Sequence, residues 1–539
     1  MGTIRQSILN FCLSFSFEAI IKERFMKIFN RLRGGAFVLL VSGIICKFLG
    51  AFFRLPLTNL LGVEGIGIFQ LVMSLYSCAL VLTAGGVSTS LSKLISSARA
   101  NEHTEKISKY LKQALFISVG VGLLIGLIFL IFGRYIALFQ SISSASSYYL
   151  FILLLPLGAG LATLRGYFQG HQNMLPTAIS QVIEQVFKFV FGLLFAYYFS
   201  KFGLAEGVFG AFLGVTISEA IALLYLFIYF AVKKQTKREI FSKEYERIVK
   251  KEFRSALFPL TISASILPIV NAFEGLIIIP RLMSGGLTST VSTTLYGLQA
   301  GVAGALLNFP LIISIAVTTS LLPNISYHIS RGDGGKRLIE KGLKTLLYLI
   351  LPTTFGIVAI SKPVFAFMYS DVTASMQDVA FNLMFYGAFS IIFTAIMQFV
   401  VMLLQANGEF NYILLITVLG GMAKAVLSFT LSAVSSINIY SVILGNIAMT
   451  TIVCLLGLYR LKRIVSFSLP AMQVATLLFG TFLMFVAVYT FVQSSYFSPI
   501  INILLGIFIG VIIYVVLTIS YLIKLFPNYH AKSAFKKTK

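Results

Sequence analysis

Several charged residues lie within long apolar stretches of the sequence, where a charge is costly unless it meets water, a partner or a ligand. Lys47 and Arg54 are seven residues apart, so on a helix they share one face. Glu274 and Arg281 repeat this spacing with an acidic first residue. Cations at membrane depth would make a central cavity positively charged. Such a cavity suits an anionic substrate.

Three further charged positions have different surroundings. Glu184 and Lys188 are four residues apart in the order that favours an ion pair along one helix, so we expect a local pair. Glu219 and Lys424 have no oppositely charged residue one turn away. We expect Lys424 to face a cavity, to meet a carboxylate such as Glu274, or to contact the substrate. The alternative for all these charges is structural pairing within the protein.

The elements that position these residues are membrane-spanning helices. The 539 residues are 58% hydrophobic and 11% charged, with a mean hydropathy of +0.93, which is more apolar side chain than one soluble core can bury. A spanning helix needs about 20 mostly apolar residues. The sequence therefore predicts an all-α polytopic membrane protein with about fourteen spans. They are placed near 36–54, 69–95, 111–133, 147–169, 177–200, 207–232, 255–280, 297–322, 338–360, 377–404, 411–434, 438–459, 469–493 and 498–523.

The basic residues alternate between loops, which predicts the orientation. Lys and Arg concentrate in segments such as 24–33, 93–112, 233–254, 331–344, 460–463 and 532–539. The intervening loops carry few: Arg54, Arg134, Lys201, Arg281 and Lys362. The positive-inside rule then places both termini in the cytoplasm of a multi-pass cell-membrane protein. This asymmetry explains the net charge of +24 without nucleic acid as a partner.

Internal matches predict a duplication of six helices. Residues 87–91 (VSTSL) recur as 317–321 (VTTSL), and Lys188 and Lys424 match at a slightly larger offset. Six helices per unit give two parallel repeats, each entering from the cytoplasm. The expected domains are a cytoplasmic N-terminal segment (1–33), an N-lobe (34–232), a linker (233–254), a C-lobe (255–460), two further spans (461–524) and a basic tail (525–539). We expect the linker to be an amphipathic helix at the membrane surface.

Other classes of protein find little support in the sequence. It lacks a phosphate-binding G-x-x-x-x-G-K-[ST] loop, an H-E-x-x-H motif and a large soluble region, so we expect no catalytic residues, no metal site and no cofactor. The cysteines, Cys12, Cys46, Cys78 and Cys454, are scattered. Residues 8–17 are apolar but precede no cleavage site, and Met26 is an alternative start. If the chain moves a substrate, the membrane potential, Na⁺ or H⁺ could supply the energy without a nucleotide.

Two groups of motifs resemble a known family. The first is KFLG from Lys47 and RLPL from Arg54, followed by LGVEGIGIFQ at 61–70. The second is RGYFQG at 165–170, followed by PTAISQ at 176–181 and then Glu184, Gln185 and Lys188. They resemble the family of stage V sporulation protein B, in the polysaccharide-transporter branch of the MOP flippase superfamily. This superfamily also includes the MurJ lipid II flippases and multidrug exporters. The resemblance runs from about residue 34 to the end.

The resemblance implies two six-helix lobes in a V, plus two further helices. It also implies that a monomer moves an undecaprenyl-diphosphate-linked cell-wall precursor or polysaccharide unit to the outer leaflet by alternating access. Its cavity residues would be Lys47, Arg54, Lys424, Arg281 and Gln299. MurJ proteins carry a cluster of cavity arginines, whereas this chain offers Lys47, approximately Arg54, and Gln299 without an arginine on the eighth helix.

The alternatives are a cation-coupled multidrug exporter of the same fold and a membrane-embedded glycosyltransferase or polymerase. An exporter of cationic drugs would need an acidic cavity. A transferase would need catalytic residues on a sizeable outer loop, and the outer loops here are short.

The charge asymmetry generates a test of orientation. Single cysteines at Lys243 and Lys537, in a chain whose native cysteines are replaced, should be shielded from impermeant thiol reagents in intact cells. A cysteine at Lys201, in an expected outer loop, should react and serves as the control. Labelling of Lys243Cys or Lys537Cys in intact cells would reverse the orientation.

Overall fold

The computed structural model describes residues 35–233, 243–330, 335–369, 372–465, 467, 471–494 and 497–525. Every regular element in these ranges is a helix, which confirms the all-α polytopic fold. The predicted N-terminal segment and basic tail lie almost entirely outside the described residues. The helices in chain order are α3 (Gly35–Leu80), η1 (Val81–Gly85), α4 (Gly86–Ala100), α5 (Glu105–Phe139), α6 (Ser146–Tyr149), α7 (Phe151–Gly170), α8 (Leu175–Ser200), α9 (Leu204–Lys233), α10 (Lys243–Ser284), α11 (Ser289–Tyr296), η2 (Gly297–Ala303), α12 (Gly304–Leu307), α13 (Pro310–Ser330), α14 (Lys336–Ala359), α15 (Ser361–Met368), α16 (Ala374–Ala406), α17 (Phe410–Leu431), α18 (Tyr440–Ile464), α19 (Ala471–Gln493) and α20 (Pro499–Leu525).

Twelve of the described helical segments are long and apolar enough to cross a membrane, or thirteen if the bent pair Ser289–Leu307 and Pro310–Leu321 forms one span. The predicted count of fourteen is thus not confirmed. From residue 111 onward the predicted spans fall on these helices within several residues, except that 297–322 comprises η2, α12 and α13. Their apolar composition explains the helices, because a backbone in hydrocarbon must satisfy its own hydrogen bonds.

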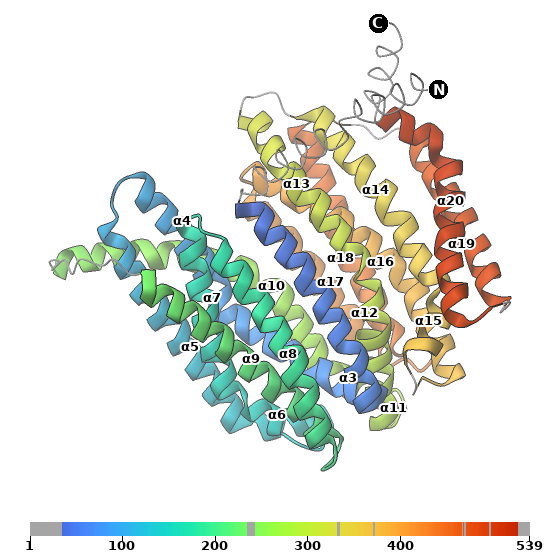
Figure 1. Ribbon diagram of the computed structural model, residues 1–539, viewed down its shortest axis with the longest axis horizontal. Helices are drawn as coiled ribbons and strands as arrows, with labels where there is room; N and C mark the ends of the chain where they lie inside the picture. The colour runs from blue at the N-terminus through green and yellow to red at the C-terminus, as the bar shows by residue number, and fades with distance from the viewer. Residues whose placement is uncertain are drawn as a thin grey trace, which may run out of the picture.

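The first two predicted spans belong to one long helical segment, Val41–Ala100. Sixty residues of straight helix would extend about 90 Å, three times the hydrocarbon thickness. The helix is instead broken at Gly62, whose φ of 69° and ψ of 176° are not helical and suit a residue without Cβ. In Figure 1 the chain of α3 turns back on itself between its first and second parts.

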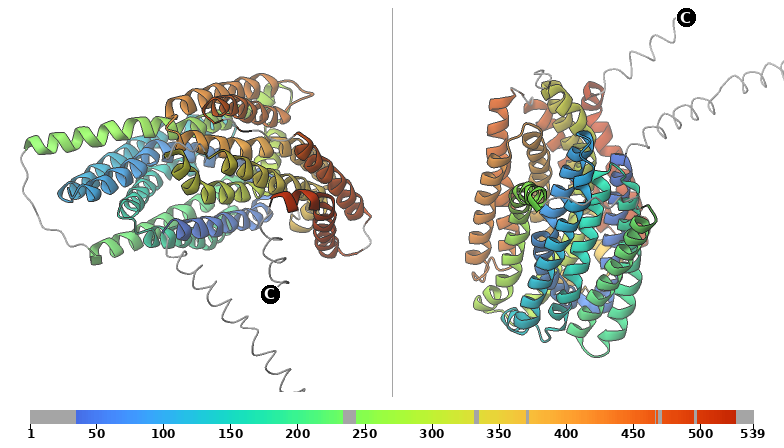
Figure 2. Two further views of the ribbon diagram at one scale, coloured as in Figure 1. Left: turned by 90° about the horizontal axis from the view of Figure 1, so that it is seen from above. Right: turned by 90° about the vertical axis from the view of Figure 1, so that its left-hand side faces the viewer.

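The helices form two groups with α3 and α10 between them. In Figure 1, α4 to α9 lie on one side of the bundle and α13 to α20 on the other. The view from above in Figure 2 shows the same separation of the blue-to-green first half from the yellow-to-red second half. One apolar cluster joins the groups, since it includes Phe151 and Phe212 from the first and Leu383 and Ile439 from the second. The two-lobe division and its boundaries remain a proposal.

The expected linker is not a separate element. Residues 234–242 lie outside the described ranges, and the remainder forms the beginning of α10, which continues without interruption to Ser284. The predicted boundary at 254 therefore falls inside a helix. In Figure 1 the beginning of α10 (light green) projects sideways across the neighbouring helices, whereas the rest runs along them. Pro259 lies in this region and lacks the N–H of a regular helical bond, which favours a bend.

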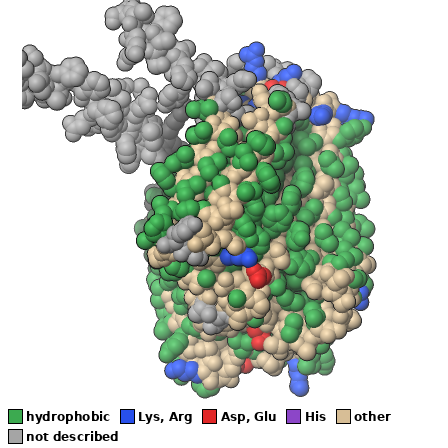
Figure 3. All heavy atoms as spheres, turned by 90° about the vertical axis from the view of Figure 1, so that its right-hand side faces the viewer, with side chains coloured by type: hydrophobic (Ala, Val, Ile, Leu, Met, Phe, Trp, Pro, Cys, Tyr) green, Lys and Arg blue, Asp and Glu red, His purple; other side chains and the backbone are tan. Residues whose placement is uncertain are grey.

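The outer surface of the bundle is apolar, as a lipid-facing surface requires. Figure 3 shows hydrophobic side chains over most of one face. On α20, Leu504, Phe508, Val511 and Val516 are each 58–64% exposed. Large exposed apolar patches of this kind mark contact with lipid or a partner. The protein is therefore a multi-pass membrane protein.

Backbone contacts at η2 depend on glycine. A Cβ at Gly297 would overlap the carbonyl oxygen of Val63 and lie 3.0 Å from the backbone nitrogen of Gly67. The second part of α3 and η2 therefore meet backbone to backbone. This close approach holds the beginning of the second part of α3, just after the Gly62 break, against the second half of the chain.

We expect Gly297→Val to weaken this contact by about 1–3 kcal/mol, the usual cost of overpacking. The matched control is Gly120→Val on α5, because a Cβ at Gly120 meets nothing within 4 Å. Thermal unfolding of both variants in the same detergent measures the difference. Equal midpoints would mean that the α3–η2 contact contributes nothing to stability.

Candidate functional site

Three cations lie along α3 and α8 without a carboxylate partner. Lys47 is exposed, whereas Arg54 and Lys188 are partly buried. None of the three forms an ion pair with any residue in the described ranges. The Nζ atom of Lys188 lies 5.6 Å from the centre of the Phe53 ring, and Lys188 is close enough to Glu184, Arg54 and Glu219 for electrostatic interactions, without an ion pair to either carboxylate. Two cations from different helices thus lie close together, with Lys47 two turns along α3 from Arg54.

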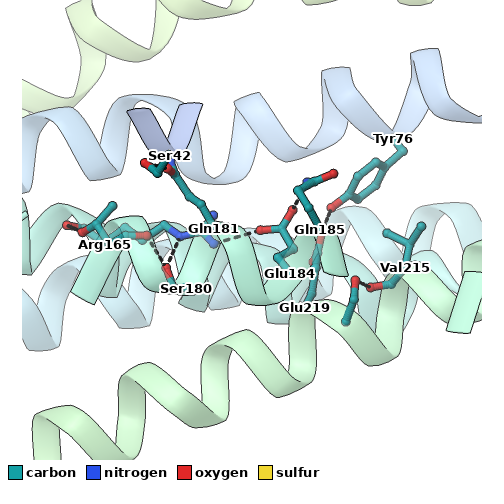
Figure 4. A network of polar contacts seen from close by, with 11 residues as sticks. Ser42, Tyr76, Arg165, Ser180, Gln181, Glu184, Gln185, Val215 and Glu219 are labelled. Atoms are coloured by element: carbon teal, nitrogen blue, oxygen red, sulfur yellow. Dashed lines mark hydrogen bonds and ion pairs between the residues drawn. The ribbon is translucent and has the colours of Figure 1, made fainter. Parts of the chain in front are cut away.

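The expected pair between Glu184 and Lys188 is not formed. Glu184 is paired with Arg165 of α7, whose Nη2 atom lies 2.9 Å from Oε2 of Glu184. Arg165 also donates from Nε to the Ser180 hydroxyl at 2.9 Å, and Gln185 donates to Oε1 of Glu184 at 3.2 Å. Figure 4 shows these side chains converging between α7 and α8. The ion pair of Glu184 is thus made with Arg165 of the neighbouring helix α7, and Lys188 remains without an ion pair in the described chain.

Glu219 of α9 occupies a buried position beside this network. It is 5% exposed, and its Oε1 accepts a hydrogen bond from the hydroxyl of Tyr76 on α3. Its Oε2 has no hydrogen-bond partner within the described part of the chain. Gly158 of α7 makes room for the carboxylate, since a Cβ there would approach Oε2 to 2.8 Å. A buried carboxylate with one free oxygen is suited to holding a proton.

Lys424 of α17 is buried and fully engaged. Its side chain is 4% exposed, and its Nζ atom lies 3.3 Å from Oε2 of Glu274 on α10. It also donates to Oδ1 of Asn271 at 2.7 Å, while Ser428 donates to the same Glu274 oxygen at 3.2 Å. The sequence left three possibilities for Lys424: a cavity, a carboxylate such as Glu274, or the substrate. The structure shows the second, a pair with Glu274. Lys424 is therefore neutralised by Glu274 and buried in this conformation, unlike the unpaired Lys47.

The remaining predicted cavity residues lie apart from these groups. The Nε atom of Arg281 donates to the Phe429 carbonyl at 2.9 Å, and its guanidinium lies 4.3 Å from the centre of the Phe429 ring. Gln299 is partly buried within the π-helical segment η2. A π-helix has an extra residue per turn and often marks a functional segment. Neither residue contacts Lys47 or Arg54 through a hydrogen bond in the described chain.

The predicted site residues thus separate into three groups. Lys47, Arg54 and Lys188 form a row of unpaired cations, Glu184 and Glu219 belong to one buried network, and the Lys424–Glu274 pair forms another. Sequence reasoning missed two members of the first network: Arg165 and Tyr76. Arg165 could have been found, because it is a charge near the end of a predicted span. Tyr76 carried no such signal. Within the described ranges there is no group of three His, Cys, Asp or Glu residues arranged to hold a metal.

Comparison with known proteins agrees with this architecture. Stage V sporulation protein B of Bacillus subtilis (strain 168) is 27% identical over 466 residues, covering 84% of this chain and 86% of the relative. Lipid II flippase MurJ of the same organism is 23% identical over 479 residues, covering 83% and 86%. The solved inward closed conformation of lipid II flippase MurJ matches the fold with a TM-score of 0.69 at 15% identity, covering 89% of this chain and 98% of that one.

The fold and these relatives define a membrane protein of the flippase and transporter class. The model of the family described as polysaccharide biosynthesis protein matches residues 32–328, more than half of the chain, so this chain belongs to that family. The resemblance seen in the sequence motifs is thereby confirmed.

The Arg165–Glu184 contact generates a stability test. Arg165→Gln should destabilise the protein by about 3 kcal/mol, the lower end of the range for breaking a buried pair, because both side chains retain some exposure. Adding Glu184→Gln should restore most of the loss by removing the stranded carboxylate. The readout is thermal stability of the detergent-solubilised protein.

Lys188→Gln is the matched control for this test and should change stability less than Arg165→Gln. If Lys188→Gln lowers the thermal stability more than Arg165→Gln does, and Glu184→Gln rescues it, then Glu184 is paired with Lys188, as the sequence predicted.

Proposed function

We propose that this protein moves an undecaprenyl-diphosphate-linked cell-wall precursor, or a lipid-linked polysaccharide unit, from the inner to the outer leaflet. The observation that carries the proposal is the row formed by Lys47, Arg54 and Lys188. Charges at membrane depth persist when they face a pathway or a ligand, and none of these three forms an ion pair in the described chain, although Lys188 lies within electrostatic range of Glu184 and Glu219. A diphosphate supplies the missing negative charge.

Phosphate recognition fits the chemistry of the row. The Arg54 guanidinium can form paired hydrogen bonds with phosphate oxygens, while Lys47 and Lys188 provide compact charges. Arg54 and Lys188 lie on different helices, α3 and α8. One diphosphate could therefore bridge both helices while the sugar and the polyprenyl chain extend away from it.

The driving force does not require a nucleotide. With the cytoplasm negative, moving one negative charge outward is favoured by about 2.3 kcal/mol per 100 mV. A diphosphate with two charges gains about twice that amount. Alternating access then needs only an interface that can open, and the backbone contact between α3 and η2 is a candidate for that interface.

The proposal also covers the location and the state of the protein. The names of the curated relatives point to flipping of lipid II in one case and to sporulation in the other. We propose a cell-membrane location with both termini in the cytoplasm, and action as a monomer.

One observation favours a second function, a cation-coupled multidrug exporter of the same fold. Glu219 keeps an oxygen without a hydrogen-bond partner in the described chain, as a proton-coupling carboxylate would. The partly buried Glu184 and the buried Glu274 are already neutralised by Arg165 and Lys424. The unpaired charges are therefore mainly cationic, which opposes binding of a cationic drug.

Complementation of a strain depleted of its lipid II flippase tests the proposal. The wild-type chain should restore growth, Lys47→Ala should abolish this, and Lys47→Arg should retain part of it because the charge remains. The protein level in the membrane is measured in parallel, so that a loss of function is separated from a loss of folding.

Lys201→Ala is the matched control, since Lys201 is an exposed lysine in the turn after α8. It should complement as well as the wild type. Normal growth with Lys47→Ala at ordinary expression would remove Lys47 from the site. If the wild type instead fails to complement but lowers drug accumulation in a Glu219-dependent way, the exporter function replaces the proposed one.

A further inference from the structure

A pocket of about 750 Å³ lies on the side of the bundle, away from the cation row of α3 and α8. Three elements form it: the η1–α4 segment, α5 and the beginning of α10. Its walls include none of Lys47, Arg54 and Lys188. The pocket is thus a different site from the one proposed for the transported diphosphate.

One rim of the pocket is strongly basic. Arg247, Lys250, Lys251 and Arg254 all line it from α10. Their spacing of three or four residues places them on one side of the helix. All four residues are exposed. No residue in the described ranges forms an ion pair with any of the four. The positive charges therefore repel one another without an ion pair in that part of the protein to offset this.

The basic rim is held in place by the opposite side of the same helix. Val249 and Phe253 are fully buried in a cluster with Tyr110 and Leu111 of α5. Glu252 accepts a hydrogen bond from Tyr110 and lies 3.1 Å from the Nζ atom of Lys106. The carboxylate nearest in sequence is therefore engaged with α5. The four cations are presented on a fixed scaffold, which lowers the entropic cost of binding an anion.

The other wall of the pocket is apolar. Ile117 and Val121 of α5, Leu82 of η1 and Phe258 of α10 line it. Phe258 is 71% exposed, so a large aromatic face is available beside the cations. A ligand that matches both walls carries negative charge at one end and hydrocarbon at the other.

We propose that this pocket binds an anionic glycerophospholipid, with its headgroup phosphate among the four cations and an acyl chain along Ile117, Val121 and Phe258. Basic residues beside a span attract anionic headgroups, and apolar surface next to them accepts the chain. The four basic side chains line one pocket beside an apolar wall, so a single headgroup phosphate can meet several of them while its acyl chain contacts that wall.

The absence of tryptophan from the sequence allows a direct test. Phe258→Trp places a single fluorophore on the pocket wall. The full-length protein is reconstituted in phosphatidylcholine vesicles that contain a minor fraction of brominated lipid, which quenches tryptophan on contact. Brominated phosphatidylglycerol should associate at least about fivefold more strongly than brominated phosphatidylcholine, since one Lys or Arg beside an anionic headgroup already gives about this factor.

The matched reporter is Phe227→Trp on α9, which is similarly exposed (61%) and lines no part of the pocket. It should quench equally with both lipids. Replacing Arg247, Lys250, Lys251 and Arg254 by Gln should abolish the preference at Phe258→Trp. If the fourfold Gln variant does not accumulate, the Phe258→Trp protein is measured at increasing salt concentration instead. Its preference for phosphatidylglycerol should then decline, because salt screens the four cations.

Other results would overturn the assignment. Equal quenching by both lipids at Phe258→Trp would show that no site exists. Displacement of brominated phosphatidylglycerol by a stoichiometric amount of undecaprenyl diphosphate would reassign the pocket to the polyprenyl carrier, and displacement by inorganic phosphate would reassign it to a free anion. The readout is binding alone, so failure of the proposed transport function leaves it unaffected.

Discussion

The cost of an unpaired charge among apolar side chains constrains how the helices of this protein can pack. Arg165 binds Glu184 between α7 and α8, and Lys424 binds Glu274 between α17 and α10. Each pair joins two helices, because separating them would leave a bare charge in hydrocarbon. The pairs therefore specify which helices are neighbours as well as neutralising charge. Lys47 and Arg54 form no such pair in the described chain, so they remain available to a ligand.

The same constraint distinguishes the two halves of the chain. In the first half, the charge network gathers around α8 and includes the half-satisfied carboxylate of Glu219. In the second half, α17, which the predicted repeat matches to α8, buries Lys424 in a pair with Glu274 and a hydrogen bond to Asn271. The first half thus retains unsatisfied groups of both signs, whereas the pair in the second half is closed. This difference places the polar chemistry of the molecule on the α3–α8 side.

The sequence was sufficient for the fold class, the family and the approximate position of most helices, because apolar length and charge asymmetry are local properties. It was insufficient for the partners of the charges. Spacing along one helix identified Lys188 as the neighbour of Glu184, but the partner came from α7 by packing. For Lys424 the sequence offered Glu274, 150 residues earlier, as one of three possibilities, and the structure has that pair, but the sequence alone did not decide among the three. Contacts between helices depend on crossing geometry, which periodicity does not contain.

The π-helical segment η2 has a consequence for the predicted duplication. Aligned on that repeat, the interval from Arg281 to Val317 is three residues longer than the interval from Arg54 to Val87. The extra length falls where η2 and the 47° bend before α13 are found. A π-turn that relaxes to an α-turn absorbs one residue less and rotates the following helix by about 100° around its axis. The second half therefore contains a built-in means of turning one helix face away and presenting another, whereas the shorter π-segment of the first half offers less of this freedom.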